Sequence, residues 1–265
     1  MADRISRRIA LIGASGWLGR SIGLALLRKG ISAPDDLICV NRSGPSADYA
    51  EWPDLRWETD LARGMADADT VILSVRPGEF RAASFAGAGK LLISLMAGIG
   101  CAEITARTGA GRVVRAMPNA AVEIGRSYSP WCATPAVDEA DSRHVGAILN
   151  AVGDADRLDS EDEIDIVTAL SGAGPAYGAL LASALLKAAR ATGLPERIAA
   201  RAVEAAVRDS APLLESGAAD DMIDSFIGYE GTTAAVLKTA RTRGFDEVIA
   251  SAVAAGVAKA REMKG

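Results

Sequence analysis

Arg8-Ile-Ala-Leu-Ile-Gly-Ala-Ser-Gly-Trp-Leu-Gly19 is the stretch of sequence that decides the fold. A short apolar run ends in a glycine turn, and the residues after it repeat their apolar side chains at helical spacing. A strand, a glycine turn and a helix in this order are typical of a Rossmann dinucleotide-binding unit. Ser15 stands where the second glycine of that pattern is usual, and Gly16 follows it. We expect Gly13 to make the turn, Gly16 to let the backbone approach a pyrophosphate, and Gly19 to let the helix pack on the strand.

The end of the second predicted strand, Asp36–Val40, indicates which dinucleotide is bound. A site for NAD usually places Asp or Glu here to bind the ribose 2′-hydroxyl, but this chain continues with Asn41, Arg42 and Ser43. An arginine pairs bidentately with a phosphate, and a serine offers a hydroxyl. We therefore expect NADP(H) as the cofactor, with NAD(H) as the alternative. The other interpretation of Arg42 is a solvated loop residue.

Strand-like apolar segments continue along the chain and alternate with helical stretches. They are found at Asp69–Val75, Lys90–Leu95 and Arg112–Arg115. This alternation predicts an α/β fold with a doubly wound parallel sheet. Ligands of such sheets bind beyond the carboxyl ends of the strands. We therefore expect Ser74–Pro77, Met96–Gly98 and Met117–Asn119 to surround one crevice.

The last part of the predicted sheet contains the only histidine. Ser129–Thr134 and Ala155–Leu158 are expected to close the sheet as late strands, on either side of a helix at Asp138–Val152. His144 is expected on the polar side of that helix, as a solvated residue rather than a catalyst. A proton needed for the reaction must then come from a hydroxyl group or from water.

The second half of the chain is predicted to be all-helical, and it begins at a second glycine turn. Ala169-Leu-Ser-Gly-Ala-Gly-Pro-Ala-Tyr177 leads into a helix of small residues that ends near Ala191, with Pro175 in its first turn. A third such turn, Gly231-Thr-Thr233, opens another helix. Two helix starts of this kind predict an anion site made of backbone amides. A tight interdomain bend is the alternative interpretation of the first.

We place the dinucleotide-binding domain at residues 1–158 and a helical substrate and dimerisation domain at residues 159–265. A helical bundle so rich in alanine exposes more apolar surface than one subunit can cover, so we expect a homodimer or a larger homo-oligomer.

Composition excludes several classes of protein. A net charge of −5, without a run of Lys or Arg, argues against nucleic acid as a partner. No apolar run reaches the roughly 20 residues that a membrane span needs. Three scattered cysteines predict a reducing compartment and neither a zinc site nor a disulfide framework. The adjacent Asp220 and Asp221 are interpreted as helix-capping residues rather than as metal ligands. We expect a soluble, cytoplasmic protein without a metal.

Seven short motifs, in this order, resemble those of the pyrroline-5-carboxylate reductases, and the resemblance extends over nearly the whole chain. They are the N-terminal glycine turn, Asn41-Arg-Ser43, Val75-Arg-Pro77, Ser94-Leu-Met-Ala-Gly98, Val114-Arg-Ala-Met-Pro-Asn119, Thr168-Ala-Leu-Ser-Gly-Ala-Gly-Pro-Ala-Tyr177 and Gly231-Thr-Thr233. The resemblance implies an oxidoreductase that reduces the imine 1-pyrroline-5-carboxylate to L-proline with NAD(P)H, a step of proline biosynthesis. It also implies a Rossmann domain followed by a helical domain that dimerises.

Site residues are carried over from the resemblance by position. Thr233 matches the hydroxyl that hydrogen-bonds the imine nitrogen, and it is the catalytic candidate. The substrate-binding candidates are Gly231, Thr232, Glu230, Ser171 and Gly172. The cofactor-binding candidates are Gly13, Ser15, Gly16, Trp17, Leu18, Asn41, Arg42, Ser43, Val75, Arg76, Pro77, Ala97, Gly98 and Asn119, of which Trp17 is also readable as a packing residue.

The chain departs from the family pattern at the substrate loop. The family usually has Ser-Pro-Gly-Gly before its two threonines, where this chain has Gly228-Tyr-Glu-Gly231, so that Glu230 replaces a glycine. A carboxylate here repels an anionic substrate unless it points away or is protonated. In addition, Ala120 and Ala121 replace a Thr-Pro pair, which removes a hydroxyl near the cofactor.

Three alternative functions follow. One is a reductase of another small imine or ketone, which Glu230 favours if it binds a cationic amine. Another is a catalytically silent NADP-binding module. The third is a hydride exchanger between NADP and a deazaflavin, which the glycine turn prompts and the helical half disfavours.

Overall fold

The computed structural model describes residues 7–214 and 218–264, and their contacts divide the chain into two compact units. The first unit runs to Gly172 and takes in the segment from Gly256 onward, while the second unit is Ala173–Ala255. Glu215, at the expected end of one helix, and Gly217, at the start of the expected polar connection, lie outside the described residues.

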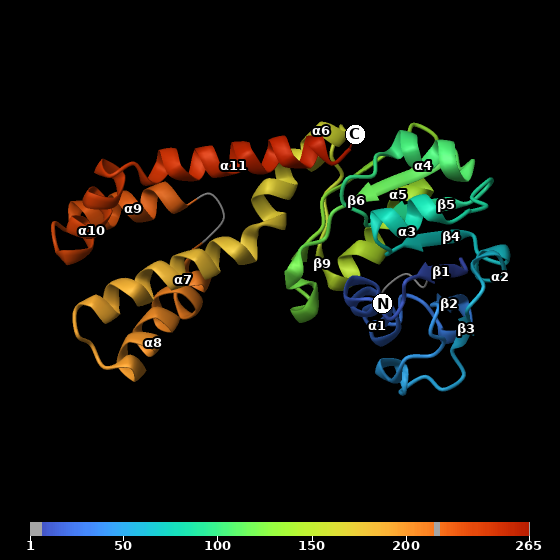
Figure 1. Cartoon of the computed structure of the whole chain (residues 1–265), viewed down its shortest axis with the longest axis horizontal. Helices are drawn as coiled ribbons and strands as arrows, with labels where there is room; N and C mark the ends of the chain where they lie inside the picture. The colour runs from blue at the N-terminus through green and yellow to red at the C-terminus, as the bar shows by residue number, and fades with distance from the viewer. Residues whose placement is uncertain (1–6, 215–217, 265) are drawn as a thin grey trace. The chain divides into compact units, whose positions relative to one another are not determined.

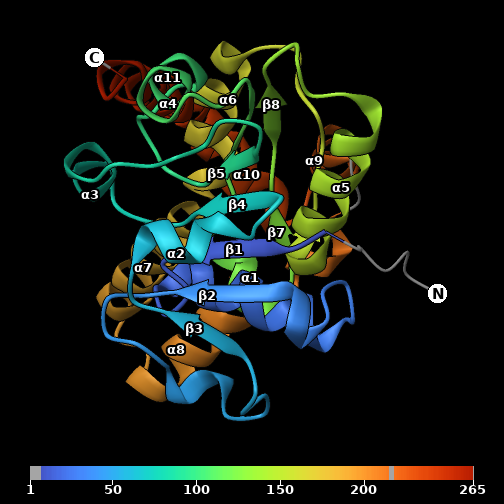
Figure 2. The same cartoon turned by 90° about the vertical axis from the view of Figure 1, so that its right-hand side faces the viewer.

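The first unit is built on a seven-stranded sheet. Figure 2 shows most of its strands side by side, and their order is β3 (Arg56–Glu58), β2 (Leu37–Val40), β1 (Ile9–Ile12), β4 (Thr70–Leu73), β5 (Leu91–Ser94), β6 (Arg112–Ala116) and β8 (Trp131–Ala133). All neighbouring pairs are parallel except β6 and β8. The direction of winding reverses between β1 and β4, where ligands of such sheets bind. The doubly wound α/β fold is confirmed.

Helices cover both faces of this sheet because successive strand residues point to opposite sides. Ile9 and Leu11 of β1 pack in one core, and Ala10 and Ile12 pack in the other. Helices α1 (Trp17–Arg28) and α5 (Glu139–Leu149) contribute to the first core. The second core receives side chains from α2 (Leu61–Ala66), α3 (Pro77–Ala82), α4 (Cys101–Thr108) and α6 (Glu161–Val167).

Three details of the sheet differ from the sequence expectation. β3 is a short strand that the sequence pattern did not reveal, because its Arg-Trp-Glu is only half-buried. Ala155–Leu158 is not a strand of the main sheet. Instead, β9 (Gly153–Asp154) pairs with β7 (Ser127–Tyr128) in a separate small sheet, and Arg157 makes one isolated bridge to Trp131.

The expectation that His144 is solvated is wrong. His144 lies on α5 and is only 6% exposed. Its Nε2 is 2.9 Å from the hydroxyl oxygen of Thr70 in β4. Burial lowers the pKa of the imidazole to about 4, so the ring is neutral at physiological pH. Because α5 packs on the sheet, the sheet covers the edge of the helix's polar face on which His144 lies.

The second half is helical, as expected (Figure 1). A π-helical turn at Thr168–Gly172 follows α6 and leads to α7 (Gly174–Ala191), which has Pro175 in its first turn. The later helices are α8 (Glu196–Glu204), α9 (Ala219–Gly228), α10 (Thr232–Thr242) and α11 (Phe245–Glu262). The expectation that Asp220 and Asp221 cap a helix is wrong, because Ala218 is the N-cap of α9 and makes no side-chain cap hydrogen bond. The two aspartates lie in the first turn of α9, where the helix dipole favours carboxylates.

The helices of the second unit expose many large apolar side chains. Among the described residues, α7, α9 and α11 each contain no buried side chain. The exposed apolar residues of this unit are Leu180, Leu181, Leu185, Leu194, Ile198, Leu213, Leu214, Phe226, Tyr229, Val236, Phe245 and Val248. By length and composition, the helical run Glu161–Ala191 is also apolar enough to cross a membrane, a test that helices packed inside soluble proteins pass as well.

Candidate active site

The glycine turn after β1 is held by close backbone contacts that leave no room for side chains. Gly13 has φ 86°, and a Cβ atom there would lie 2.2 Å from the carbonyl oxygen of Ser74. A Cβ atom on Gly19 would lie 2.3 Å from the carbonyl oxygen of Gly13. The turn can therefore form only with glycine at both positions.

Helix α1 begins directly after this turn and presents a candidate anion site. Gly16 is its N-cap, and among the described residues no side chain caps the helix start. The first amides of a helix have no acceptor within the helix, and the helix dipole adds partial positive charge. Trp17 and Leu18 are the first residues of α1, so their N–H groups are suited to a pyrophosphate.

A cleft of about 770 Å³ lies at the carboxyl ends of the central strands, next to this helix start. Nine of the fourteen predicted cofactor-binding residues line it. They are Gly13, Ser15, Gly16, Trp17, Leu18, Asn41, Arg42, Val75 and Arg76. Trp17 is half-exposed in the cleft, and its indole N–H donates to the Glu123 carboxylate, so it is not a core residue. The cleft has the size and the amide donors that a dinucleotide needs.

The loop after β2 places Arg42 at this cleft, where it is already paired with an acid. Its guanidinium is 2.6 Å from a carboxylate oxygen of Glu79 on α3, although the two residues are 37 positions apart. The second carboxylate oxygen of Glu79 accepts the backbone N–H of Arg76 and so caps α3. The Asn41 side chain donates to the Ser43 hydroxyl at 2.6 Å and holds the loop in a turn.

Several residues of the cleft escaped the sequence reasoning. Glu79 and Thr59 line it together with Ile12, Val40, Leu61, Ala82, Ala83, Phe85 and Leu95. Ser74, which the sequence placed at this crevice, lines it as well. Thr59 follows β3 directly, so recognising that half-buried strand would have revealed it. Glu79 had a sequence signal as the third residue of a helix that begins with proline.

The other five predicted cofactor residues do not line the cleft. Ser43 lies in the Asn41 turn, and Pro77 is the first residue of α3. Ala97 and Gly98 follow β5, and a Cβ atom on Gly98 would lie 2.8 Å from the carbonyl oxygen of Met263. Gly98 therefore makes room for the C-terminal segment.

Asn119 joins two of the predicted groups of residues. Its side-chain amide donates to the carbonyl oxygen of Ser171 at 3.1 Å. Ser171 and Gly172 belong to the π-helical turn, where the Ser171 hydroxyl donates to the carbonyl oxygen of Val167 at 3.2 Å. The hydrogen bond from Asn119 to Ser171 links a predicted cofactor residue to a predicted substrate residue within the first unit.

The start of α10, in the second unit, is a further helix N-terminus of the expected kind. Gly231 is its N-cap without a side-chain cap, and Thr232 and Thr233 are exposed in its first turn. Glu230, also exposed, has φ 54°, a left-handed conformation that suits glycine. The family pattern has glycine at this position, and glycine adopts such a conformation without strain.

Comparisons with known proteins agree with the motifs. The chain is 33% identical to pyrroline-5-carboxylate reductase from Pseudomonas aeruginosa, over 97% of this chain and 96% of that protein. The chain belongs to the pyrroline-5-carboxylate reductase family. The family's dimerisation domain matches residues 161–263. This reductase-like chain is thus an NAD(P)H-dependent oxidoreductase with a helical dimerisation domain.

Solved reductases of the family share the fold over the whole chain. The structure from Coxiella burnetii is 28% identical, with a TM-score of 0.86 over 98% of this chain and all of that chain. The Plasmodium falciparum enzyme, solved with NADP bound, is 21% identical, with a TM-score of 0.82 over 99% of this chain and 100% of its own. The family domain begins three residues after the predicted boundary at 158, whereas the compact units divide at Gly172.

Proposed function

We propose that this enzyme reduces 1-pyrroline-5-carboxylate to L-proline with NADPH. The observation that carries the proposal is the combination of the α1 cleft with the uncapped Gly231–Thr233 helix start, in a chain of this family. NADPH, when bound, supplies a hydride to the imine carbon. The residues of the chain bind both reactants, orient them and assist the transfer of one proton to nitrogen.

The amides at the start of α1 are suited to the pyrophosphate, and Arg42 to a 2′-phosphate. The Plasmodium falciparum reductase was solved with NADP, which supports the same cofactor here. In this proposal Arg42 exchanges its contact with Glu79 for the phosphate, which is a doubly charged acceptor. Preference for NADPH over NADH then depends on Arg42.

The amides of Thr232 and Thr233 hold the substrate carboxylate at the positive end of the α10 dipole. The Thr233 hydroxyl would donate a hydrogen bond to the imine nitrogen and relay a proton to it from water, so that the hydroxyl group is restored. One C–H and one N–H bond form as the C=N double bond becomes single, so the hydride and the proton balance the reaction. Positioning of the reactants supplies much of the remaining acceleration.

The test is NADPH oxidation with 1-pyrroline-5-carboxylate, using Thr233→Ala, Thr233→Ser and the control Thr239→Ala. Thr239 lies on the exposed side of the same helix and outside the proposed site. We expect Thr233→Ala to lower kcat about 100-fold, because a positioned proton donor contributes at least that much. Thr233→Ser should retain most activity, and Thr239→Ala should match the wild type. Absence of turnover by the wild-type enzyme would refute the proposed substrate.

Glu230 supports a second candidate, the reduction of a small imine that lacks a carboxylate or carries a positive charge. An exposed carboxylate next to Gly231 favours such a substrate electrostatically. Comparison of 1-pyrroline-5-carboxylate with the uncharged 1-pyrroline separates the two candidates. A higher kcat/KM for 1-pyrroline would favour the second.

We also propose a homodimer formed by the second unit. The twelve large apolar side chains that this unit exposes support this assembly, as does the dimerisation domain. Light scattering on the full chain tests it, with Leu181→Glu expected to weaken the dimer and Lys187→Glu as a control on the same helix.

A further inference from the structure

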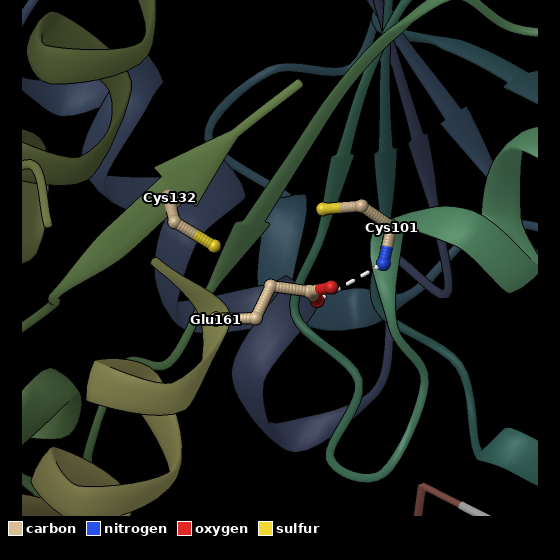
Figure 3. A group of neighbouring side chains, drawn as sticks. All are labelled: Cys101, Cys132 and Glu161. Carbon is tan, nitrogen blue, oxygen red and sulfur yellow. Dashed lines mark hydrogen bonds between the residues drawn. The ribbon is translucent and has the colours of Figure 1, made fainter. Parts of the chain in front are cut away.

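Two of the three cysteines lie next to a glutamate in the first unit, and none of these three residues lines the dinucleotide cleft (Figure 3). Cys101 is the first residue of α4, Cys132 lies in β8, and Glu161 is the first residue of α6. The two sulfur atoms and a carboxylate oxygen all lie within 4.8 Å of one another. Figure 3 shows the two thiols and the carboxylate directed toward a common space.

The backbone holds these three side chains in place. A Glu161 carboxylate oxygen, Oε1, accepts the backbone N–H of Cys101 at 3.0 Å, which fixes the acid beside the first thiol. Cys132 pairs with Arg115 across the antiparallel edge of the sheet. Both thiols are buried, at 8% and 3% exposure, so neither is a freely rotating surface group.

The charges around the cluster suit a divalent cation. Arg115 lies 3.5 Å from Glu161 and 3.1 Å from Asp165, and Lys264 lies 2.5 Å from Asp165. Lys264 also lies 3.8 Å from Asp162. Two cations thus face three carboxylates, so the group has one negative charge in excess while both thiols are protonated. A bound dication that displaces both thiol protons adds two positive and two negative charges, so the net charge of the group is unchanged.

Space for a metal and for a further ligand is present. A cavity of about 550 Å³ is lined by Cys101, Cys132 and Glu161, and it also reaches Thr105 and Asp159. Tetrahedral zinc has Zn–S bonds of about 2.3 Å, which places two sulfur ligands about 3.8 Å apart. The three ligand atoms therefore need to approach by about 1 Å at most. A water molecule from the cavity can complete the coordination.

We propose that Cys101, Cys132 and Glu161 bind one borderline-soft divalent cation of the zinc type. Two thiolates and one carboxylate are a ligand set that zinc accepts and that magnesium or calcium does not prefer. The metal would link α4, β8 and α6 and so stabilise the beginning of the helical half on the sheet. The sequence expectation of no zinc site rested on the scattered positions of the cysteines, and the fold brings two of them together.

The experiment uses the full chain, reduced and freed of metal, with Co²⁺ as a spectroscopic probe and Zn²⁺ as its competitor. Wild type should bind one equivalent of Co²⁺ and develop a thiolate-to-cobalt charge-transfer band that Zn²⁺ abolishes. Cys101→Ser and Cys132→Ser should each weaken binding by about 100-fold, and Glu161→Gln by about 10-fold. Cys39→Ala is the matched control, since Cys39 is equally buried but lies in β2.

A second measurement keeps the test valid if a cysteine variant fails to fold. In wild type, Zn²⁺ should protect Cys101 and Cys132 from alkylation under mild denaturation while Cys39 reacts, as read by mass spectrometry. Zn²⁺ should also raise the Tm of wild type, and Mg²⁺ should not. Absence of the charge-transfer band, equal binding by either cysteine variant, or oxidation of the two thiols to a disulfide that Zn²⁺ does not prevent would overturn the proposal.

Discussion

The Arg42 guanidinium lies 2.6 Å from the Glu79 carboxylate at the dinucleotide cleft, so the proposed phosphate-binding cation is held by an acid of the same chain. Both side chains are largely open to solvent, at 89% and 43% exposure. An exposed pair of this kind is worth about 0–1 kcal/mol. A phosphate group can therefore displace Glu79 at little cost, and the pair positions Arg42 before the cofactor arrives.

Substitution of Arg42 and substitution of Glu79 should change the preference for NADPH over NADH in opposite directions. We expect Arg42→Ala to raise the KM for NADPH by about 10- to 100-fold, because a charged hydrogen bond of about 1.5–3 kcal/mol is lost. The KM for NADH should change little. Glu79→Gln should lower the KM for NADPH by up to about 5-fold while retaining the hydrogen bond that caps α3. Steady-state kinetics with both cofactors measures these values, and an equal change for NADH would contradict the assignment of Arg42.

The conformation and the charge of Glu230 can be separated by two substitutions. Glu230→Gly should raise the free energy of unfolding by about 1 kcal/mol, because a non-glycine residue at φ 54° is strained. Glu230→Gln keeps that strain and should leave stability unchanged. Both variants should lower the KM for 1-pyrroline-5-carboxylate if the carboxylate repels the substrate. Chemical denaturation and kinetics read the two effects, and an unchanged KM in both variants would show that Glu230 points away.

The buried imidazole of His144 should make stability depend on pH. Its pKa is lowered from 6.5 to about 4, first by burial and then by the charge of Arg7. The unfolded chain therefore binds a proton between pH 6.5 and about 4 that the folded protein rejects. The contribution of the neutral His144 to the free energy of unfolding is therefore fully present above pH 6.5. The free energy of unfolding should fall by about 3 kcal/mol as the pH approaches 4.

The matched variant for this prediction is His144→Gln, which has no titrating group and can still hydrogen-bond Thr70. The difference in unfolding free energy between wild type and variant should shrink or reverse across that pH range. Since this is the only histidine of the chain, no other imidazole contributes. A parallel pH dependence in both proteins would contradict the prediction.

An added methyl group in place of a glycine hydrogen should impair NADPH binding only where another part of the backbone lies close to that glycine. Gly13→Ala places Cβ 2.2 Å from the Ser74 carbonyl oxygen, whereas Gly89 has a similar positive φ of 76° with nothing within 4 Å. Gly89→Ala should therefore cost only the strain, about 1 kcal/mol, without changing the KM for NADPH. Gly13→Ala should destabilise the protein further and weaken NADPH binding by more than about 10-fold. Calorimetry and cofactor titration compare the two, and equal effects would show that strain alone matters.

Local sequence patterns determined the main architecture of this protein. Strand-length apolar runs, the spacing around Gly13 and Gly19, and the turns before Pro175 and Thr232 are short-range features, so their physical consequences follow without knowledge of the fold. They predicted the doubly wound sheet, the helical half and, as cofactor-binding candidates, nine of the residues that line the cleft. Thr59 was missed because β3 is half-buried and carries no apolar pattern.

Only the tertiary structure decided which distant side chains meet. It paired Arg42 with Glu79, buried His144 against Thr70, and gathered Cys101, Cys132 and Glu161 around one space. The sequence could not give these contacts, because the periodicity of a helix or strand fixes which face a residue occupies but not what packs against that face. Packing of α3, α4, α5 and α6 on the sheet made that choice.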